Sequence, residues 1–530
     1  MPEHEQRLYL GCDTDNQAVF MWPAMACRHG LIAGATGTGK TVSLKLLAEQ
    51  FSAMGVPVVV TDVKGDLSGT AVAGSSNKHI EARLAQMPLD GFTYQGYPVV
   101  LWDVFGQAGH PLRATLGEMG PVVLARLLQL NGTQQDILVL LFNVADDEGM
   151  LLLDWPDLVA MLQFALAHAR TLSNDYGHMS KGSLNAILRK VRALESEGME
   201  AFCGEPALDL MDWLSLTPEG KGSVHVLCAD KLFLNHRLYG AVLLWLLAEL
   251  YERLPEVGDL DKPRLVVFFD EAHLLFDELP APVLDKVEQV VRLIRSKGVG
   301  LYFATQQPAD IPQAIVGQLG HRIQHALRTF TPHDQKQLKA LVDGFRTHPT
   351  LDLQAVIPAL KVGEALVSVL DENGQPTIPA QTMMAPPTSR IGPLGETERH
   401  EIIRQSRFYG RFEERIDRTS AHEQVKARLQ NPEKSEKSQQ PQRASEANTS
   451  RRGQSGSQAF LNSVLRALGS QLGRIGMTAL VAWLFGRQVS GGRSRRRQTS
   501  AQAFGNSVAR SIGTQVGRQL TRGVLGSLQR

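Results

Sequence analysis

The sequence predicts an α/β protein in which a mostly parallel β-sheet is covered by helices on both faces. Two observations carry this prediction. Short apolar runs alternate with segments whose apolar residues recur at helical spacing, a pattern typical of strands connected by crossover helices. The run at residues 265–269 is continuously apolar, as expected for a central parallel strand that is buried on both faces.

The first strand–helix connection contains a glycine-rich loop. A short apolar run ends at Ala33, and a helix with one apolar face is predicted from about residue 40 to 54. Between them the sequence is Gly34, Ala35, Thr36, Gly37, Thr38, Gly39, Lys40, Thr41. Glycines at this spacing let main-chain N–H groups face a bound phosphate at the positive end of the helix. We therefore expect residues 34–41 to bind nucleotide phosphates, with Lys40 at the β- and γ-phosphates and Thr41 on Mg²⁺.

The central strand at 265–269 ends in two carboxylates, Asp270 and Glu271. After a phosphate-binding loop, the first carboxylate is expected to hold Mg²⁺ through water, and the second to polarise the water that attacks the γ-phosphate. A protein that only binds nucleotide would not need the second one. His273 extends the string to Asp-Glu-Ala-His, as in DEAH-box helicases, but the rest of that pattern is missing, so a structural role for His273 is favoured.

Further strands are predicted along the chain, with helical patterns between several of them. The seven predicted strands cover residues 56–61, 98–103, 223–228, 265–269, 300–304, 321–326 and 365–370. Residues 111–216 interrupt this alternation, because they are rich in Leu, Ala and Met at helical spacing and contain no strand-like run. We interpret them as an inserted helical subdomain that divides the core into residues 1–110 and 217–375.

The region after the core changes in composition three times. Residues 376–429 are interpreted as an extension, with a Pro-, Thr- and Met-rich extended strap to 395 and helical character from 396. Residues 430–457 are polar and rich in Ser and Gln, and we predict a disordered linker there. The remaining segment, 458–530, forms a basic tail.

This tail contains a repeat, because the pattern of residues 458–474 recurs at 502–518. Each copy predicts an amphipathic helix, and both contain Gly-x-x-x-Gly, which gives a smooth contact surface. From Asn448 to the end the chain has 13 arginines, no lysine and no acidic residue, so the rest of the chain carries 42 basic and 54 acidic residues. Three targets stay open for the tail: a protein partner or its own helices, nucleic acid, and an anionic membrane surface.

Composition narrows the class of protein. The 530 residues are 43% hydrophobic, which is enough for two or three packed domains. The four cysteines are scattered without a Cys-x-x-Cys pair, so neither a zinc site nor a disulfide framework is indicated. No signal peptide is recognised, and no uncharged apolar run reaches the roughly 18 residues needed to cross a bilayer. A cytoplasmic location is therefore expected.

Six motifs occur in a fixed order between about residues 10 and 395. They are the loop 34–41, Thr61-Asp62-Val63-Lys64-Gly65-Asp66, Asp270-Glu271, the stretch 291–300, Ala304-Thr305-Gln306-Gln307-Pro308, and Gly363-Glu364-Ala365-Leu366-Val367. This series resembles the motifs of the HerA/FtsK ATPase superfamily, and most closely those of the bacterial YjgR group of HerA-like ATPases.

The resemblance implies a RecA-like P-loop NTPase core that hydrolyses ATP with Mg²⁺. It also implies a homo-oligomeric ring, usually a hexamer, that translocates double-stranded DNA. It assigns Gln306 as a sensor near the γ-phosphate and either Arg292 or Arg295 as the arginine that reaches the nucleotide of a neighbouring subunit. Such an arginine stabilises charge on the transferred phosphoryl group and is worth about 10³–10⁵ in rate. The alternative is that both arginines only solvate a helix face.

For Asp62, Lys64 and Asp66, two interpretations weigh equally: a second acidic loop beside the phosphates, or an exposed turn at a strand end. For the whole protein we expect a Mg²⁺-dependent, helicase-like ATPase that moves or remodels DNA. The alternative is an ATP-driven assembly protein, or an ATPase at a membrane surface, that does not act on nucleic acid. A nucleotide-binding scaffold without hydrolysis is disfavoured by Glu271.

Overall fold

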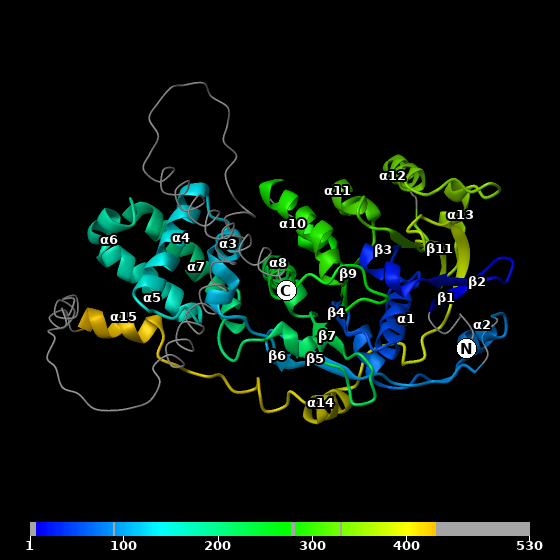
Figure 1. The fold of residues 1–530 in the computed structure, drawn as a ribbon, viewed down its shortest axis with the longest axis horizontal. Helices are drawn as coiled ribbons and strands as arrows, with labels where there is room; N and C mark the ends of the chain where they lie inside the picture. The colour runs from blue at the N-terminus through cyan, green and yellow to red at the C-terminus, as the bar shows by residue number, and fades with distance from the viewer. Residues whose placement is uncertain (1–6, 88, 90, 277–280, 329–330, 431–530) are drawn as a thin grey trace, which may run out of the picture. The chain divides into compact units, whose positions relative to one another are not determined.

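The computed structural model describes residues 7–87, 89, 91–276, 281–328 and 331–430, and Figure 1 shows their path. One sheet of twelve strands organises these residues, in the order β2-β1-β12-β11-β10-β3-β9-β8-β4-β7-β5-β6. The strands are β1 (Leu8–Asp13), β2 (Ala18–Met21), β3 (Gly30–Ala33), β4 (Val58–Asp62), β5 (Val99–Asp103), β6 (His110–Pro111), β7 (Val224–Cys228), β8 (Leu265–Phe269), β9 (Val299–Thr305), β10 (His321–Gln324), β11 (Glu364–Ser368) and β12 (Ala380–Met384). Residues 431–457 of the predicted linker and the tail 458–530 lie outside the described residues, whereas the first residue of that linker, Gln430, ends the helix α15 (Ala421–Gln430).

The predicted fold class is confirmed. All seven predicted strands are present, with ends that differ by no more than two residues from those expected. Eight neighbouring strands, from β10 to β6 in the sheet order, pair in parallel. The other strands, β11, β12, β1 and β2, extend the sheet antiparallel. The segment 376–395, expected to be an extended strap, therefore contributes β12, which is hydrogen-bonded between β1 and β11.

Apolar side chains cover both faces of the parallel block. On one face, α1 (Lys40–Ala53) buries Leu44, Leu47 and Phe51 against the even-numbered residues of β8, including Val266 and Phe268. On the other face, the rings of Phe269 and Phe303 stack at 5.5 Å, and Phe276 of α9 (His273–Phe276) packs against Phe303 at 5.7 Å. Burial on both faces explains why these strands are continuously apolar.

Five helices follow β6, in the region that we interpreted as an insertion. They are α3 (Leu116–Leu127), α4 (Gly132–Asp147), α5 (Trp155–Ala167), α6 (Ala169–Asp175) and α7 (Lys181–Ser196). Three of them begin with capping boxes, in which a polar side chain accepts a hydrogen bond from a main-chain N–H of the first turn. The helix α8 (His236–Arg253) then leads from β7 to β8.

The C-terminal extension contains two helices rather than one continuous helical segment. These are α14 (Glu396–Gln405) and α15 (Ala421–Gln430), and the chain between them is not helical. The intervening segment is held by aromatic packing, since the rings of Phe408 and Phe412 each lie 5.2 Å from Trp102 of β5. The main-chain N–H of His422 in α15 donates to Asp157 of α5 at 2.8 Å, which connects this extension to the five-helix region.

The remaining helices lie in connections between strands. They are α2 (Lys78–Leu84), α10 (Ala281–Leu293), α11 (Gln313–Val316), α12 (Pro332–Asp343) and α13 (Leu353–Ala359). None of the helices within the described ranges has the length and apolar character required to cross a membrane.

Candidate phosphate-binding and hydrolysis site

The strand order brings three predicted motifs to one edge of the sheet. The strand β3 leads into the glycine-rich loop, β8 ends at the two carboxylates, and β9 lies hydrogen-bonded between them. Because all three strands are parallel, their carboxyl ends lie at the same edge, where open α/β sheets bind ligands. The strands β3 and β8 are two places apart in the sheet, a separation of about 10 Å. Gln306 directly follows β9, so it lies between the ends of these two strands.

The loop 34–39 has the backbone of an anion cradle. Gly34 has φ of 153° and Gly37 has φ of 77°, conformations that L-residues with a side chain rarely adopt. At Gly34 space also requires glycine, because a Cβ atom there would lie 2.5 Å from the Cβ of His325. Within the described part of the chain, the main-chain N–H groups of Gly37, Gly39 and Lys40 donate to no other residue. Unpaired donors at a helix start are what a phosphate would satisfy.

Lys40 lies inside this cradle and folds back on the loop. Its Nζ donates to the carbonyl oxygens of Gly34 at 2.5 Å and Ala35 at 3.3 Å, and only 6% of the residue is exposed. Burial lowers the pKa of Lys40, and the charge of Lys64 lowers it further. A phosphate would replace two neutral carbonyl partners with charged oxygens, which form stronger hydrogen bonds. Thr41, the next residue, is half-buried at the start of α1.

Asp270 is held rigidly at the end of β8. Its main-chain N–H donates to Thr61 Oγ1 at 2.8 Å, and the Tyr239 hydroxyl contacts both Thr61 Oγ1 at 3.0 Å and the Asp270 carbonyl oxygen at 2.9 Å. The Asp270 carboxylate accepts from the N–H of Glu271 at 3.0 Å. Burial, followed by the neighbouring charge of Glu271, raises the pKa of Asp270 to about 7. Two buried carboxylates next to each other favour a cation at this edge.

Glu271 adopts a left-handed backbone conformation, with φ of 47°. For a residue with a long side chain this costs about 1–3 kcal/mol, and such strain is typical of functional sites. Its Oε1 accepts a hydrogen bond from Gln306 Nε2 at 3.0 Å, whereas its buried Oε2 has no hydrogen-bond partner among the described residues. His273 Nδ1 lies 3.7 Å from that Oε2, so His273 borders the site.

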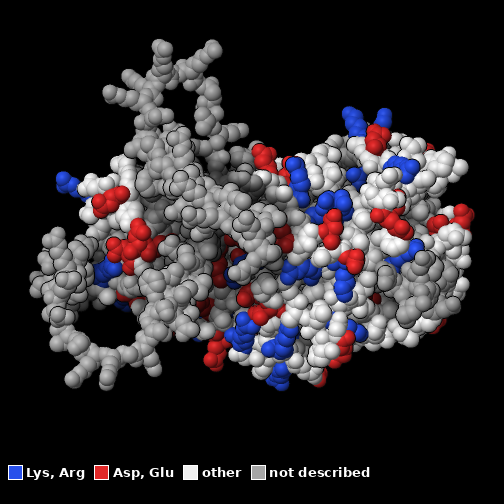
Figure 2. All heavy atoms as spheres, viewed as in Figure 1, with Lys and Arg blue, Asp and Glu red and all other residues white. Residues whose placement is uncertain are grey.

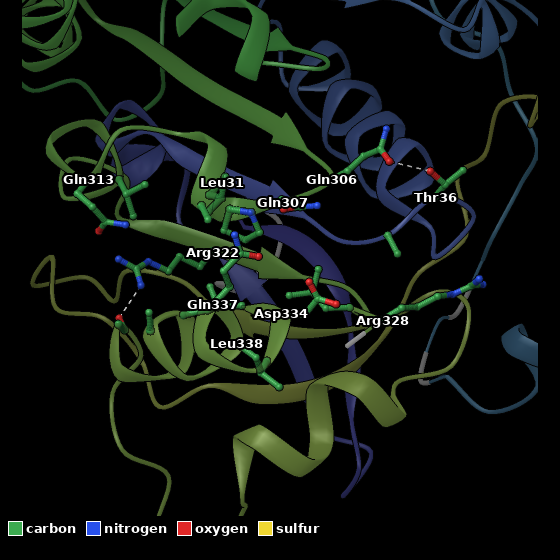
Figure 3. A pocket seen from close by; sticks show the side chains of 18 residues that line it. Leu31, Thr36, Gln306, Gln307, Gln313, Arg322, Arg328, Asp334, Gln337 and Leu338 are labelled. Atoms are coloured by element: carbon green, nitrogen blue, oxygen red, sulfur yellow. Dashed lines mark hydrogen bonds between the residues drawn. The ribbon is translucent and has the colours of Figure 1, made fainter. Parts of the chain in front are cut away.

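Gln306 connects the phosphate loop to this carboxylate. Its Oε1 accepts a hydrogen bond from the hydroxyl of Thr36, at the tip of the loop, at 3.0 Å (Figure 3). Its Nε2 donates to Glu271, so one amide group bridges the two motifs. Only the resemblance assigned Gln306 to this region; the structure places it between the loop and the carboxylate, and its role as a sensor stays a prediction.

In the loop after β4, Asp62 belongs to a turn at the strand end, whereas Lys64 reaches the candidate site. Asp62 is 1% exposed and accepts hydrogen bonds from the main-chain N–H groups of Gly65, Leu67 and Ser68, so it stabilises the turn. Burial raises its pKa to about 6. The ammonium of Lys64 instead lies 3.5 Å from Glu271 Oε1, within the candidate site. Asp66 is half-buried, and its carbonyl oxygen accepts from Lys45 at 3.0 Å.

A cavity of about 430 Å³ opens beside Thr36 and Gln306, on the sheet face opposite α1 (Figure 3). Its walls come from β10, α11 and α12, and include Arg322, Gln337 and Leu338. Arg322 donates to the Gly344 carbonyl at 2.6 Å, so its guanidinium is already engaged. The cavity therefore borders the candidate site without containing its carboxylates.

Arg292 and Arg295 lie away from this edge. Arg292, on α10, forms an ion pair with Glu288 of the same helix at 2.6 Å, and its side chain is 56% exposed. Arg295 follows in the short helix Ile294–Lys297, just before β9 begins. Because β9 runs toward the phosphate loop, both arginines lie toward the opposite, amino edge. Within one subunit the structure does not bring them to the predicted site.

Three buried residues support the site and were not among the predicted site residues. Ser43 Oγ and His325 Nε2 lie 2.9 Å apart, and His325 Nδ1 lies 2.8 Å from the Glu364 carbonyl oxygen, so His325 braces the phosphate-loop helix against β11. Tyr239 supports Asp270 from α8. No sequence motif marks these residues, because their roles arise only when distant strands and helices pack together.

On the face shown in Figure 2, lysines and arginines of the described residues are interspersed with acidic side chains. This face carries no continuous basic surface among the described residues.

Comparison with known proteins identifies the family. Among solved structures, the chain is similar to the plasmid coupling protein TrwB, with 14% identity, a TM-score of 0.47, and 71% of this chain and 90% of that chain covered. It is also similar to VirB4 of Thermoanaerobacter pseudethanolicus, with 16% identity, a TM-score of 0.46, and 71% and 96% covered. No curated protein matches the sequence. Residues 7–530 match the family described as Helicase HerA-like C-terminal, and the chain therefore belongs to this family.

Proposed function

We propose that this protein hydrolyses ATP in a Mg²⁺-dependent reaction at the carboxyl edge of its sheet. The observation that carries the proposal is the hydrogen-bonded chain from Thr36 through Gln306 to Glu271. It joins the loop that would cradle the phosphates to a buried carboxylate, one oxygen of which has no hydrogen-bond partner in the part of the chain that the structure describes. Glu271 is suited to accept the proton of an attacking water at this oxygen, because Gln306 holds the other. Membership of the HerA-like family supports the same activity.

The residues present fit both ATP and Mg²⁺. Unpaired N–H groups and Lys40 suit the phosphates, and a hydroxyl (Thr41) with a carboxylate (Asp270) suits Mg²⁺, which prefers a few hard oxygen ligands together with waters and substrate phosphates. When bound, the cation would neutralise charge on the phosphate oxygens. Asp270 supplies its ligand oxygen from a fixed backbone, since Thr61 and Tyr239 hold it.

Two substitutions test the proposed activity. Lys40→Ala should abolish nucleotide binding or turnover, because it removes the charge at the β- and γ-phosphates. Glu271→Gln should bind ATP and fail to hydrolyse it, because the cradle remains while the base is lost. Lys181→Met, which removes an exposed lysine of α7, serves as the control and should hydrolyse ATP normally. Wild-type turnover by Glu271→Gln would contradict the role of this carboxylate.

We further propose that Arg292 or Arg295 acts on the nucleotide of a neighbouring subunit in a homo-oligomeric ring, such as a hexamer. Their position at the amino edge is compatible with this role, because they do not reach the site of their own subunit. Mixing Glu271→Gln protein with Arg292→Ala/Arg295→Ala protein should restore part of the activity, since some interfaces would pair an intact base with an intact arginine. Full activity of a monomer at high dilution would refute the ring.

The third part of the proposal is that ATP hydrolysis is coupled to translocation or remodelling of DNA, as expected from the resemblance to the YjgR group, at the cytoplasmic location expected from the sequence. The basic tail is a candidate DNA contact, because each phosphate neutralised by arginine adds about −0.9 to the slope of log affinity against log salt. Deleting residues 448–530 removes 13 arginines and no predicted ATP-site motif, so basal ATPase should persist while this slope flattens. Unchanged slopes, with binding of the tail to anionic vesicles, would favour the membrane-surface alternative.

A further inference from the structure

We propose that Lys64 is a second lysine of the nucleotide site, which exchanges the carboxylate of Glu271 for the γ-phosphate and thereby distinguishes a nucleoside triphosphate from a diphosphate. This inference rests on the proposed ATPase function and adds to it a residue that recognises the triphosphate.

The contacts of Lys64 show a residue that is placed in the site but not fixed there. Its Nζ lies 3.5 Å from Glu271 Oε1, beyond the 2.7–2.9 Å of a strong charge-assisted hydrogen bond. Its side chain is 39% exposed, whereas that of Glu271 is 4% exposed. A loosely paired, solvent-accessible ammonium on a flexible stem can move to a nearby anion at little cost.

The same Glu271 oxygen also accepts the hydrogen bond from Gln306 at 3.0 Å. Losing Lys64 therefore does not leave Oε1 without a partner, since Gln306 remains. Because Gln306 already donates to Glu271 Oε1, this oxygen attracts Lys64 less strongly than a phosphate group does. A phosphate group carries up to two negative charges and three acceptor oxygens. The exchange thus gives Lys64 a stronger partner and leaves Glu271 hydrogen-bonded to Gln306.

Lys64 also faces the space where the γ-phosphate is expected. Its Nζ lies 3.5 Å from Glu271 Oε1, and Gln306, which donates to that oxygen, accepts from Thr36 at the tip of the phosphate loop, so Lys64 lies beside the groups expected around the γ-phosphate. In agreement with this position, its charge adds to burial in lowering the pKa of Lys40, whose Nζ lies in the phosphate cradle. Its charge also acts on Asp270, whose pKa it lowers against the larger effect of burial. Two lysines and two carboxylates at one edge of the sheet supply charges of both signs, as a polyanion with its cation requires. A diphosphate would leave Lys64 paired with Glu271.

Release of Lys64 would change the environment of the base only when a triphosphate is present. Glu271 Oε1 would then keep Gln306 and lose the neighbouring ammonium, while Oε2, which has no hydrogen-bond partner among the described residues, would accept from a water. With ADP the ion pair between Lys64 and Glu271 persists, and the carboxylate stays engaged.

Binding rather than turnover tests this inference. The affinities of Mg-ADP and of Mg-AMPPNP, a non-hydrolysable triphosphate, are measured by calorimetry for the wild type, Lys64→Met, Lys64→Arg and the control Lys181→Met. Lys64→Met should weaken AMPPNP binding about tenfold or more, the range of a hydrogen bond between charged groups, while ADP affinity changes less than about twofold. Lys64→Arg keeps the charge and should retain most of the preference for the triphosphate.

A double-mutant cycle with Glu271→Gln tests whether Lys64 exchanges Glu271 for the γ-phosphate or is only attracted to the phosphate. Removing the carboxylate frees Lys64 in advance, so Glu271→Gln should strengthen AMPPNP binding more when Lys64 is present than in the Lys64→Met background. Equal loss of ADP and AMPPNP affinity in Lys64→Met, or an unchanged preference, would overturn the inference while leaving the ATPase proposal intact. If the wild type binds neither nucleotide, the ATPase proposal and this inference both fail.

Discussion

Removing the side chain of Gln306 is the most direct test of how the site is coupled. The amide donates to Glu271 Oε1 at 3.0 Å and accepts from the Thr36 hydroxyl at 3.0 Å. Gln306→Ala deletes both bonds, so the buried carboxylate keeps the longer contacts with Lys64 and His273 and loses its one side-chain hydrogen bond among the described residues. Lys40 and the loop glycines are unchanged, so the phosphate cradle should still bind nucleotide.

The expected size of the effect follows from the bond that is lost. A hydrogen bond to a charged group contributes about 1.5–3 kcal/mol. If this hydrogen bond stabilises the transition state more than the bound ATP, its loss should lower kcat by about 10- to 100-fold. Gln306→Glu should be more severe, because it places a second negative charge within hydrogen-bond distance of the buried carboxylate of Glu271.

Steady-state ATP hydrolysis and nucleotide binding, measured on the same preparations, decide this prediction. The matched control is Gln307→Ala, which removes the adjacent, exposed amide, whose side chain forms no hydrogen bond with any described residue. Gln307→Ala should keep kcat within about twofold of the wild type, because it breaks no bond to the base. A Gln306→Ala enzyme with wild-type kcat would refute the coupling, and one that fails to bind ATP would show that Gln306 acts on the cradle instead.

Three further substitutions test the surroundings of the site by urea unfolding. Tyr239→Phe should reduce the free energy of unfolding by about 1–2 kcal/mol, because the hydroxyl that contacts Thr61 and Asp270 is buried; an unchanged value would mean that this contact is not stabilising. Glu49→Gln should cost about 2 kcal/mol, since its carboxylate accepts four hydrogen bonds from Thr388 and Ser389 and an amide cannot accept them all; equal stability would contradict that network. Burial lowers the pKa of His325 to about 4, so between pH 6.5 and 4 only the unfolded chain takes up a proton there and stability falls with falling pH; His325→Gln should lose less stability over this window, and an identical pH profile would refute the assignment.

The parts of the site that the sequence predicted are those encoded in consecutive residues. The loop 34–41 requires glycines at fixed spacing, and Asp270-Glu271 follows a strand recognisable from its apolar run. Both can be interpreted without knowing what lies next to them in space. The seven predicted strands share this property, because burial on both faces is visible in each strand by itself.

The antiparallel strands of the sheet show where such local reasoning stops. The strands β1 and β12 pair across more than 360 residues, with Gly11 opposite Met384, and neither has the continuous apolar run of the central strands. Residues 380–384 include Gln381 and Thr382, so their composition suggested an extended segment without identifying its partners. Pairing of distant segments depends on the complete fold, which composition does not specify.

Lys64 illustrates the same limit inside the site. In the sequence it is one charge in the string Thr61-Asp62-Val63-Lys64-Gly65-Asp66, where a turn and an acidic loop were equally plausible. The structure separates the residues of this string, because Asp62 accepts hydrogen bonds from three main-chain N–H groups of its own loop while the ammonium of Lys64 lies 3.5 Å from Glu271, after the neighbouring strand β8. The parallel pairing of β4 with β8 makes this possible, since it places the loop after one strand beside the carboxylates after the other. The strand order, and not the local sequence, therefore places Lys64 in the site. The same reasoning applies to Gln306, which lies between the phosphate loop and Glu271 because β9 lies between β3 and β8.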